Sequence, residues 1–289
     1  MSELDPADRA RLEATLGTRV RAARPIHRGY TPAQRWLLTL ADGRSAFAKV
    51  GVDANTAGWL RTERELYAAL AGSAFLPRLL GFVDDPARPA LVLEDLSAAH
   101  WPPPWTRPQV DAVLAALEAV HAQRLPLAPI GFMGGSFDGW TQVAQDPAPF
   151  LGLELCSPAW LEAELPTLLA AEAEAELGGD ALLHFDVRSD NLCLRDGRAL
   201  LIDWNHACCG NPEVDLAFFL PSLAAEGGPP PEALLPGRPA LAALISGFFA
   251  ARAGLPVIPH APRVREIQRL QLEAALPWAV RALGLSAPR

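Results

Sequence analysis

The run Trp101-Pro-Pro-Pro-Trp105 separates two stretches of the chain that differ in residue periodicity. Consecutive prolines supply no backbone donors to a helix or an inner strand, so regular structure is expected to stop there. Before the run, short apolar segments between turns predict β-strands; after it, apolar residues recur at helical spacing. Strands followed by helices predict an α+β protein in two parts. We place the boundary between Leu93 and Trp101, which gives residues 1–96 and 97–289.

The first stretch contains a predicted β-hairpin that carries an unusual lysine. Apolar residues 36–40 and 45–50 flank an Asp42-Gly43 turn, a strong hairpin signal. Lys49 lies near the end of the second strand and is the single lysine among 25 basic residues, the others being arginine. The sequence therefore indicates a position that requires a compact ammonium group, which a planar guanidinium does not replace.

A helix is predicted directly after this hairpin. Between residues 56 and 70, apolar positions recur at helical spacing, and Glu63 and Glu65 lie among them. The other predicted elements are strands at 82–83 and 90–96 and amphipathic helices at 108–123 and 160–177, with helices dominating to the C-terminus.

The composition argues against several classes of protein. The formal net charge of -8 argues against a nucleic-acid partner, because such binding depends on Lys and Arg neutralising phosphates. The longest apolar stretch, about residues 239–251, is shorter than the roughly 20 residues that cross a bilayer. The N-terminus lacks the basic and apolar segments of a secretion signal, so we expect a cytoplasmic protein, either a monomer or a homodimer. The four cysteines form no paired CxxC pattern and predict neither a zinc site nor disulfides.

A second predicted hairpin gathers oxygen-bearing side chains. Apolar residues 192–194 and 199–202 flank an Asp196-Gly197 turn, so residues whose numbers sum to about 393 are expected to lie opposite one another. Asn191 and Asp203 sum to 394, which brings an amide and a carboxylate together at the open end of the hairpin. Such oxygen ligands suit Mg²⁺ that also holds substrate phosphates. Asp186, a few residues upstream, is then left to accept a proton.

The same residues resemble a known family. The pattern His184-Phe-Asp186, four residues, Asn191, and then Ile202-Asp203-Trp204, with Asp215-Leu-Ala downstream, resembles the aminoglycoside phosphotransferase and choline kinase branch of the protein-kinase-like superfamily. The resemblance extends from about residue 22 to residue 249. It implies a two-lobed fold, in which an antiparallel sheet and one helix (1–96) bind the nucleotide and a larger, mostly helical lobe (97–289) carries catalysis and acceptor binding.

The resemblance also implies a role for each motif residue. Lys49 would reach the phosphates of ATP or GTP, held by Glu63 or, as the alternative, by Glu65. Asp186 would be the catalytic base, and Asn191 and Asp203 would bind Mg²⁺.

Further residues are assigned by position in the same pattern. Residues 27–33 occupy the place of a phosphate-covering loop, in which Gly29 permits close backbone approach. Backbone groups of Glu94 and Leu96 would contact the base of the nucleotide. Arg188, two residues after Asp186, would stabilise charge on the transferred phosphoryl group, with an exposed loop arginine as the alternative. His184 and Asp215 would brace the catalytic loop, and Phe185 stands where this branch usually carries glycine.

The acceptor stays open at this level. The acidic segment 160–177 suits a cationic substrate or a solvated helix face, whereas the region after Asp215 has a local charge of +3. We therefore infer a small hydroxylated acceptor less cationic than kanamycin-like drugs, such as a nucleoside antibiotic or another hydroxylated metabolite, with contacts from Arg263, Arg265 or Arg269. Three readings remain: an antibiotic kinase, a metabolic kinase for choline, ethanolamine, homoserine or a sugar, and a nucleotide-binding pseudoenzyme. A choline site would need an aromatic cage, for which Trp140, Trp160 and Trp278 are candidates, and core packing explains these three residues equally well.

Overall fold

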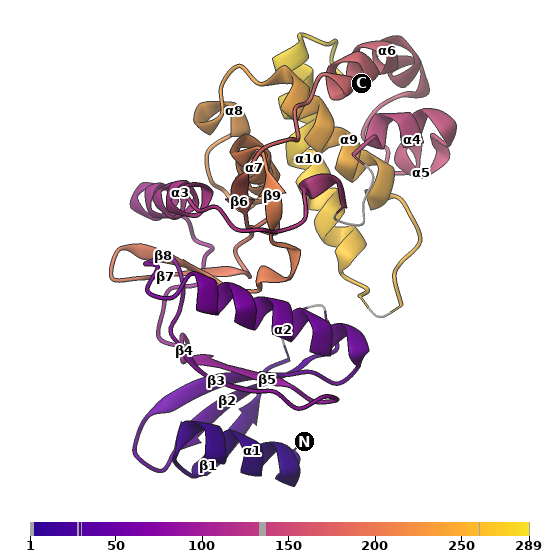
Figure 1. Ribbon diagram of the computed structural model, residues 1–289. Coiled ribbons are helices and arrows are strands. Elements are labelled where there is room, and N and C mark those ends of the chain that lie inside the picture. The colour runs from indigo at the N-terminus through magenta and orange to yellow at the C-terminus, as the bar shows by residue number, and fades with distance from the viewer. Residues whose placement is uncertain (1–2, 28, 30, 133–136, 260, 289) are drawn as a thin grey trace. The chain divides into compact units, whose positions relative to one another are not determined.

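The computed structural model describes residues 3–27, 29, 31–132, 137–259 and 261–288 (Figure 1). The chain forms two compact units. The first contains the residues up to Trp101 together with Asp190–Asn205, and the second contains Pro102–Ser189 together with the residues from His206 onward. The functional division into residues 1–96 and 97–289 stays a prediction, and the segment Asp190–Asn205 belongs to the first unit although it follows that division in the sequence.

The first unit is built on a five-stranded antiparallel sheet in the order β1-β2-β3-β5-β4. The predicted Asp42-Gly43 hairpin is present between β2 and β3, and Arg35 on β2 lies directly opposite Lys49 on β3. The strands are β1 (Val20–Pro25), β2 (Gln34–Leu40), β3 (Ser45–Val50), β4 (Leu79–Val83) and β5 (Ala90–Glu94). One side of the sheet carries much of this unit's core, including Trp36, Leu38, Leu40, Ala48, Val50 and Val92.

Two helices pack on the sheet of the first unit. Helix α1 (Pro6–Leu16) packs on β1 and β4, and α2 (Ala54–Ala69) packs on β3 and β5, from opposite sides of the sheet (Figure 1). A capping box formed by Asp53 and Thr56 satisfies the first backbone donors of α2. This fixed start orients the helix so that Glu63 faces the sheet, where it is 1% exposed.

The second predicted hairpin has the expected register. Strands β7 (Leu192–Arg195) and β8 (Arg198–Leu201) pair antiparallel around Asp196-Gly197, both at positive φ. Leu192 lies opposite Leu201, so the residue numbers sum to 393 as predicted. Beyond the ladder, the Ile202 N–H donates to the Asn191 carbonyl at 2.9 Å. Asn191 and Asp203 therefore leave the same end of the hairpin.

The second unit is mostly helical and centres on α9 (Pro239–Ala253), which contacts α4, α5, α6, α7 and α10 (Figure 1). Helix α9 is apolar around its circumference, as expected for a central helix. The other elements of the second unit are α3 (Arg107–His121), η1 (Ile130–Phe132), α4 (Gly139–Gln145), α5 (Ala148–Leu151), α6 (Pro158–Ala173), α7 (Pro212–Ala225), α8 (Pro231–Leu234), α10 (Val264–Leu283) and the β6–β9 pair (Ala181–Leu183, Cys208–Gly210). The short helix η2 (Trp204–His206) ends the hairpin segment. Within the described ranges, no helix has the length and apolar character needed to cross a membrane.

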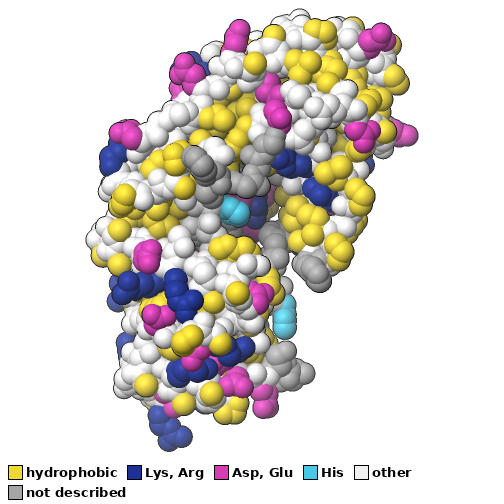
Figure 2. Space-filling model, turned by 45° about the vertical axis from the view of Figure 1, so that its right-hand side comes forward, with side chains coloured by type: hydrophobic (Ala, Val, Ile, Leu, Met, Phe, Trp, Pro, Cys, Tyr) yellow, Lys and Arg dark blue, Asp and Glu magenta, His cyan; other side chains and the backbone are white. Residues whose placement is uncertain are grey.

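Charged side chains are distributed over the surface of both units. Figure 2 shows acidic and basic side chains interspersed on one face of the molecule. Several form exposed ion pairs, such as Arg61–Asp84 at 3.1 Å and Arg269–Glu273 at 2.9 Å. Pairs of this kind contribute less than about 1 kcal/mol each. The buried charges described below therefore matter more to the structure.

Candidate active site

The first unit contains a buried cluster of opposite charges around Lys49. The Lys49 ammonium donates to Glu63 Oε2 at 3.0 Å and to Asp203 Oδ1 at 2.8 Å. Lys49 is 5% exposed and Glu63 is 1% exposed. The structure thus brings Glu63, and not the exposed Glu65, to the lysine.

Burial and charge act in opposite directions within this cluster. Burial disfavours the Lys49 ammonium, but Glu63 and Asp203 outweigh it and raise the pKa of Lys49. Burial also raises the pKa of Glu63; the Asp203 carboxylate adds to this effect and Lys49 opposes it. The ammonium is therefore held charged at neutral pH in a position shielded from water.

Arg35 is a second cation beside this cluster and was not predicted as a site residue. Burial lowers the pKa of Arg35, and the Asp203 and Glu63 charges oppose that effect, which places the guanidinium near both carboxylates. Its guanidinium donates to the Ala33 carbonyl at 2.8 Å, the Thr31 carbonyl at 3.2 Å and the Thr31 hydroxyl at 2.7 Å. The planar guanidinium thus donates to three acceptors on the loop that precedes β2 and holds that loop in place.

Gly29 lies against the same guanidinium. It has φ +96°, and a Cβ atom there would lie 2.7 Å from Arg35 Cζ. The predicted need for glycine at this position thus has two causes, the backbone conformation and the contact with Arg35. Arg28 and Tyr30, which also belong to the predicted phosphate-covering loop, lie outside the described residues.

The open end of the β7–β8 hairpin carries the two predicted magnesium ligands. Asn191 is 5% exposed, and Asp203 has a positive φ of 64° that turns the chain out of the hairpin. The Asp203 carboxylate accepts hydrogen bonds from Lys49 and from the side chain of Asn205. Among the described residues, no group of three or more His, Cys, Asp or Glu side chains is arranged to hold a metal. One carboxylate and one amide fit Mg²⁺, which commonly takes few protein ligands and completes its shell with phosphates and water.

The predicted catalytic loop lies in the second unit and carries Asp186 and Arg188. The Arg188 guanidinium donates to Asp186 Oδ1 at 2.5 Å. His184 is fully buried, and its Nδ1 accepts from the Asp186 N–H at 3.3 Å. Within the loop, His184 therefore holds the backbone of Asp186 and Arg188 holds its carboxylate.

Asp215 on α7 anchors the start of this loop. Its carboxylate accepts from the backbone N–H groups of His184 at 2.9 Å and Phe185 at 2.8 Å. The same carboxylate lies 3.0 Å from His121 Nε2 on α3. Asp215 is 1% exposed, so it joins two helices to the catalytic loop within the core. The bracing contacts expected of His184 and Asp215 are present.

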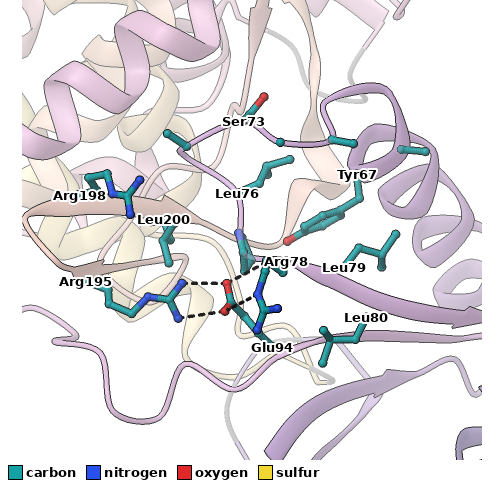
Figure 3. A pocket seen from close by; sticks show the side chains of 15 residues that line it. Tyr67, Ser73, Leu76, Arg78, Leu79, Leu80, Glu94, Arg195, Arg198 and Leu200 are labelled. Carbon is teal, nitrogen blue, oxygen red and sulfur yellow. Dashed lines mark hydrogen bonds and ion pairs between the residues drawn. The ribbon is translucent and has the colours of Figure 1, made fainter. Parts of the chain in front are cut away.

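Glu94, one of the two expected base-contacting residues, ends strand β5 in the first unit. Its N–H donates to the Arg78 carbonyl at 3.0 Å, and the Leu96 carbonyl accepts from the Ala99 N–H at 3.0 Å. The Glu94 carboxylate faces a cavity of about 600 Å³ and pairs there with Arg195 at 2.9 Å and Arg78 at 3.3 Å (Figure 3). Burial raises the pKa of Glu94, but the hydrogen bonds from Arg195 and Arg78 outweigh burial and lower it.

Several candidates for the acceptor site have other partners. The three tryptophans considered for an aromatic cage are buried in the core, at 0% for Trp140, 5% for Trp160 and 1% for Trp278. Arg263 and Arg269 form exposed pairs with Glu266 and Glu273, and Arg265 donates to Gln268. In the acidic segment, Glu172 is buried and accepts from the Trp140 N–H, whereas Glu162, Glu174 and Glu176 are exposed.

The cysteines behave as isolated thiols. All four are unpaired, and burial raises the pKa of Cys208 to about 12. The Cys209 thiol donates to the Leu125 carbonyl at 3.2 Å. Among the described residues, none of these thiols belongs to a group of three or more His, Cys, Asp or Glu side chains that could hold a metal.

A five-stranded sheet with a buried Lys49–Glu63–Asp203 cluster beside it, and a mostly helical unit with an aspartate loop, agree with the protein-kinase-like phosphotransferase fold. The expected α+β kinase-like fold is confirmed. The model of the phosphotransferase enzyme family, APH, matches residues 22–253, and the chain belongs to this family.

Solved structures of low sequence identity share the fold. An aminoglycoside phosphotransferase from Alicyclobacillus acidocaldarius is 16% identical, with a TM-score of 0.60 over 98% of this chain and 96% of its own. APH(2″)-IIIa, solved with GDP and kanamycin, is 10% identical, with a TM-score of 0.58 over 95% and 97%. The macrolide 2′-phosphotransferase MphH from Brachybacterium faecium is 18% identical, with a TM-score of 0.55 over 90% and 96%. No curated protein matches the chain in sequence.

Proposed function

We propose that this protein transfers the γ-phosphate of ATP or GTP to a hydroxyl group of a small molecule, and that the acceptor is an antibiotic. The observation that carries the proposal is the buried contact of Lys49 with Glu63 and Asp203. Burying an ammonium between two carboxylates costs desolvation energy that their attraction offsets only in part, so its presence here indicates a functional role. The nucleotide-bound structure of APH(2″)-IIIa, which shares the fold, supports a nucleotide co-substrate.

In this proposal the first unit binds the nucleotide. Lys49 contacts the phosphates as a point charge, and Arg35 holds the covering loop over them. Asn191 and Asp203 hold Mg²⁺, which neutralises charge on the phosphates when bound. Because the Glu94 N–H and the Leu96 carbonyl already have partners, base contact would use the Glu94 carbonyl and the Leu96 N–H.

The catalytic loop supplies the remaining groups. Asp186 orients the acceptor hydroxyl and takes its proton, and Arg188 keeps the Asp186 carboxylate in place. Phosphoryl transfer needs mainly positioning and charge neutralisation, so a rigid loop anchored by Asp215 suits it. The presence of Lys49, Asp186, Asn191 and Asp203 weighs against the pseudoenzyme reading. The burial of Trp140, Trp160 and Trp278 removes the aromatic cage considered for choline.

A panel assay tests the proposal. Purified protein is incubated with Mg²⁺, ATP or GTP, and single acceptors drawn from aminoglycosides, nucleoside antibiotics, macrolides, choline, homoserine and sugars. We expect nucleotide consumption that depends on one antibiotic class. Turnover with a metabolite alone would contradict the antibiotic assignment, and intact nucleotide binding without turnover of any acceptor would contradict the phosphotransferase assignment.

A further inference from the structure

Four half-buried phenylalanine rings gather beside the catalytic loop, and we call them the phenylalanine cluster: Phe137, Phe185, Phe218 and Phe248. The centroid of the Phe218 ring lies 5.0 Å from that of Phe185 and 4.9 Å from that of Phe248. Phe137 lies 5.9 Å from Phe185 and 6.2 Å from Phe248. Rings at these distances form favourable edge and offset contacts, and their partial exposure leaves apolar aromatic surface available.

Different segments of the second unit supply these rings. Phe218 projects from α7 and Phe248 from α9, whereas Phe137 precedes α4 and Phe185 belongs to the catalytic loop. All four rings are therefore held within one compact unit. The anchor of the loop, Asp215, comes from the same α7 that carries Phe218, so that helix positions both the loop and part of the cluster.

The backbone of Phe185 shows that its ring is retained at a cost. Phe185 has φ +61°, a conformation that glycine adopts freely and that other residues disfavour. Asp215 enforces this conformation by accepting the His184 and Phe185 N–H groups. An aromatic residue where the backbone favours glycine points to a function for its side chain. Asp186 is the next residue, with its Cα about 3.8 Å from that of Phe185.

The charges around the cluster do not suit a polycation. The Arg252 guanidinium lies 3.9 Å from the Phe248 ring centroid and donates to the Phe248 carbonyl at 2.9 Å. The charges of Asp138, Arg265 and Glu172 are among those that act on Arg252. Burial raises the pKa of Glu172 to about 7, so this carboxyl is partly neutral at physiological pH. The Phe248 ring therefore already faces a guanidinium, which does not favour a second cation at this ring.

We propose that the phenylalanine cluster is an acceptor subsite that selects an uncharged planar ring, and that the acceptor is a hydroxylated molecule carrying such a ring. A nucleoside is the simplest example of this chemistry. The inference rests on the proposed function: the acceptor oxygen bonds to the γ-phosphorus, the bond from that phosphorus to the β,γ-bridging oxygen breaks, and the hydroxyl proton passes to Asp186. The ring on the cluster would hold the hydroxyl near that carboxylate.

Matched acceptors test the selectivity. We would compare kcat/KM for adenosine and uridine with that for methyl β-riboside, which keeps the sugar hydroxyls and lacks the ring, and with that for kanamycin. We expect a preference of at least about 100-fold for the nucleosides, because a ring buries more apolar surface than the single methylene that gives about 10–200-fold. In Phe185→Gly, which the backbone accommodates, the preference for the ring should fall at least tenfold.

Control variants separate this effect from a loss of folding. Phe218→Leu keeps most of the side-chain volume and should also lower the preference for the ring. Phe82→Leu, on β4 of the first unit and not a member of the cluster, should leave it unchanged. Saturation-transfer NMR reports contact between the protein and the ring protons of the nucleosides. ADP is added at saturating concentration, so that the nucleosides do not bind at the nucleotide site.

The outcomes distinguish the two levels of the proposal. Efficient transfer to kanamycin or methyl riboside, with nucleosides no better, would overturn the subsite and leave the phosphotransferase function standing. Absence of transfer to every acceptor would contradict the function, whereas ring contact in the NMR experiment that Phe185→Gly abolishes would still support the subsite. No transfer to nucleosides together with no ring contact would overturn the subsite.

Discussion

Replacing Lys49 by methionine tests the buried charge cluster directly. Methionine keeps most of the side-chain length and removes the ammonium from between Glu63 and Asp203, which accept from it at 3.0 and 2.8 Å. Removing one member of a buried ion pair typically costs about 3–5 kcal/mol. Because Arg35 stays close to both carboxylates, we expect a loss toward the lower end, about 3 kcal/mol of unfolding free energy.

The loss should depend on pH in a defined direction. Burial and the Asp203 carboxylate raise the pKa of Glu63, and the Lys49 ammonium lowers it. Removing Lys49 therefore raises the pKa of Glu63 further. A carboxyl whose pKa is higher in the folded state than in the unfolded state favours folding at low pH and loses that contribution as pH rises through the folded-state pKa. The deficit of Lys49→Met relative to wild type should therefore be largest at pH 8 and shrink toward pH 5.

Urea unfolding, followed by tryptophan fluorescence and circular dichroism at pH 5 and 8, measures both effects. Arg61→Met is the matched control, because Arg61 lies on the same α2 and its contacts, the ion pair with Asp84 and hydrogen bonds to the Asp85 and Pro86 carbonyls, lie near the surface. We expect this control to lose less than about 1 kcal/mol. A Lys49→Met variant as stable as that control at pH 8 would refute the buried cluster.

Two further predictions concern the buried carboxyl of Glu172 and the loop brace, meaning the hydrogen bonds from Arg35 to Thr31 and Ala33. Arg35→Ala should raise the KM for nucleotide at least about tenfold, equivalent to about 1.4 kcal/mol, with a smaller change in kcat, and Gly29→Ala should act in the same direction. Steady-state kinetics checks both, with exposed Arg44→Ala as the control; a KM within twofold of wild type would contradict the brace. Glu172, whose pKa burial raises to about 7, should make wild-type stability fall by up to about 3 kcal/mol as pH rises from 4.5 through 7. Glu172→Gln should flatten that component in urea unfolding, and unchanged pH dependence would argue against the buried carboxyl.

Local sequence signals predicted much of the fold that positions the site. The Asp42-Gly43 and Asp196-Gly197 turns fixed two hairpins because such dipeptides favour the tight turn that sets strand register. Register then placed Asn191 beside Asp203. Helix α1 was missed although its signals were present, since Asp5 caps the helix, Pro6 begins it and Gly17 ends it at positive φ.

The remaining site features depend on contacts between distant segments. The cross-strand position of Arg35 opposite Lys49 was available from the hairpin register, but its hydrogen bonds to Thr31 and Ala33 required the path of the loop. The phenylalanine cluster joins rings from residues 137 to 248, and no local periodicity links them. The positive φ of Phe185 was likewise not predictable from neighbouring residues.

The most direct test of the central claim is single-turnover transfer of the γ-phosphate to the identified acceptor by wild type and by Asp186→Asn, with nucleotide affinity measured on both proteins. We expect the variant to lose several orders of magnitude in the transfer rate and to bind nucleotide as wild type does, because Asp186 lies outside the unit that we propose binds the nucleotide. Transfer at the wild-type rate by Asp186→Asn would contradict the assignment of this loop as the catalytic centre.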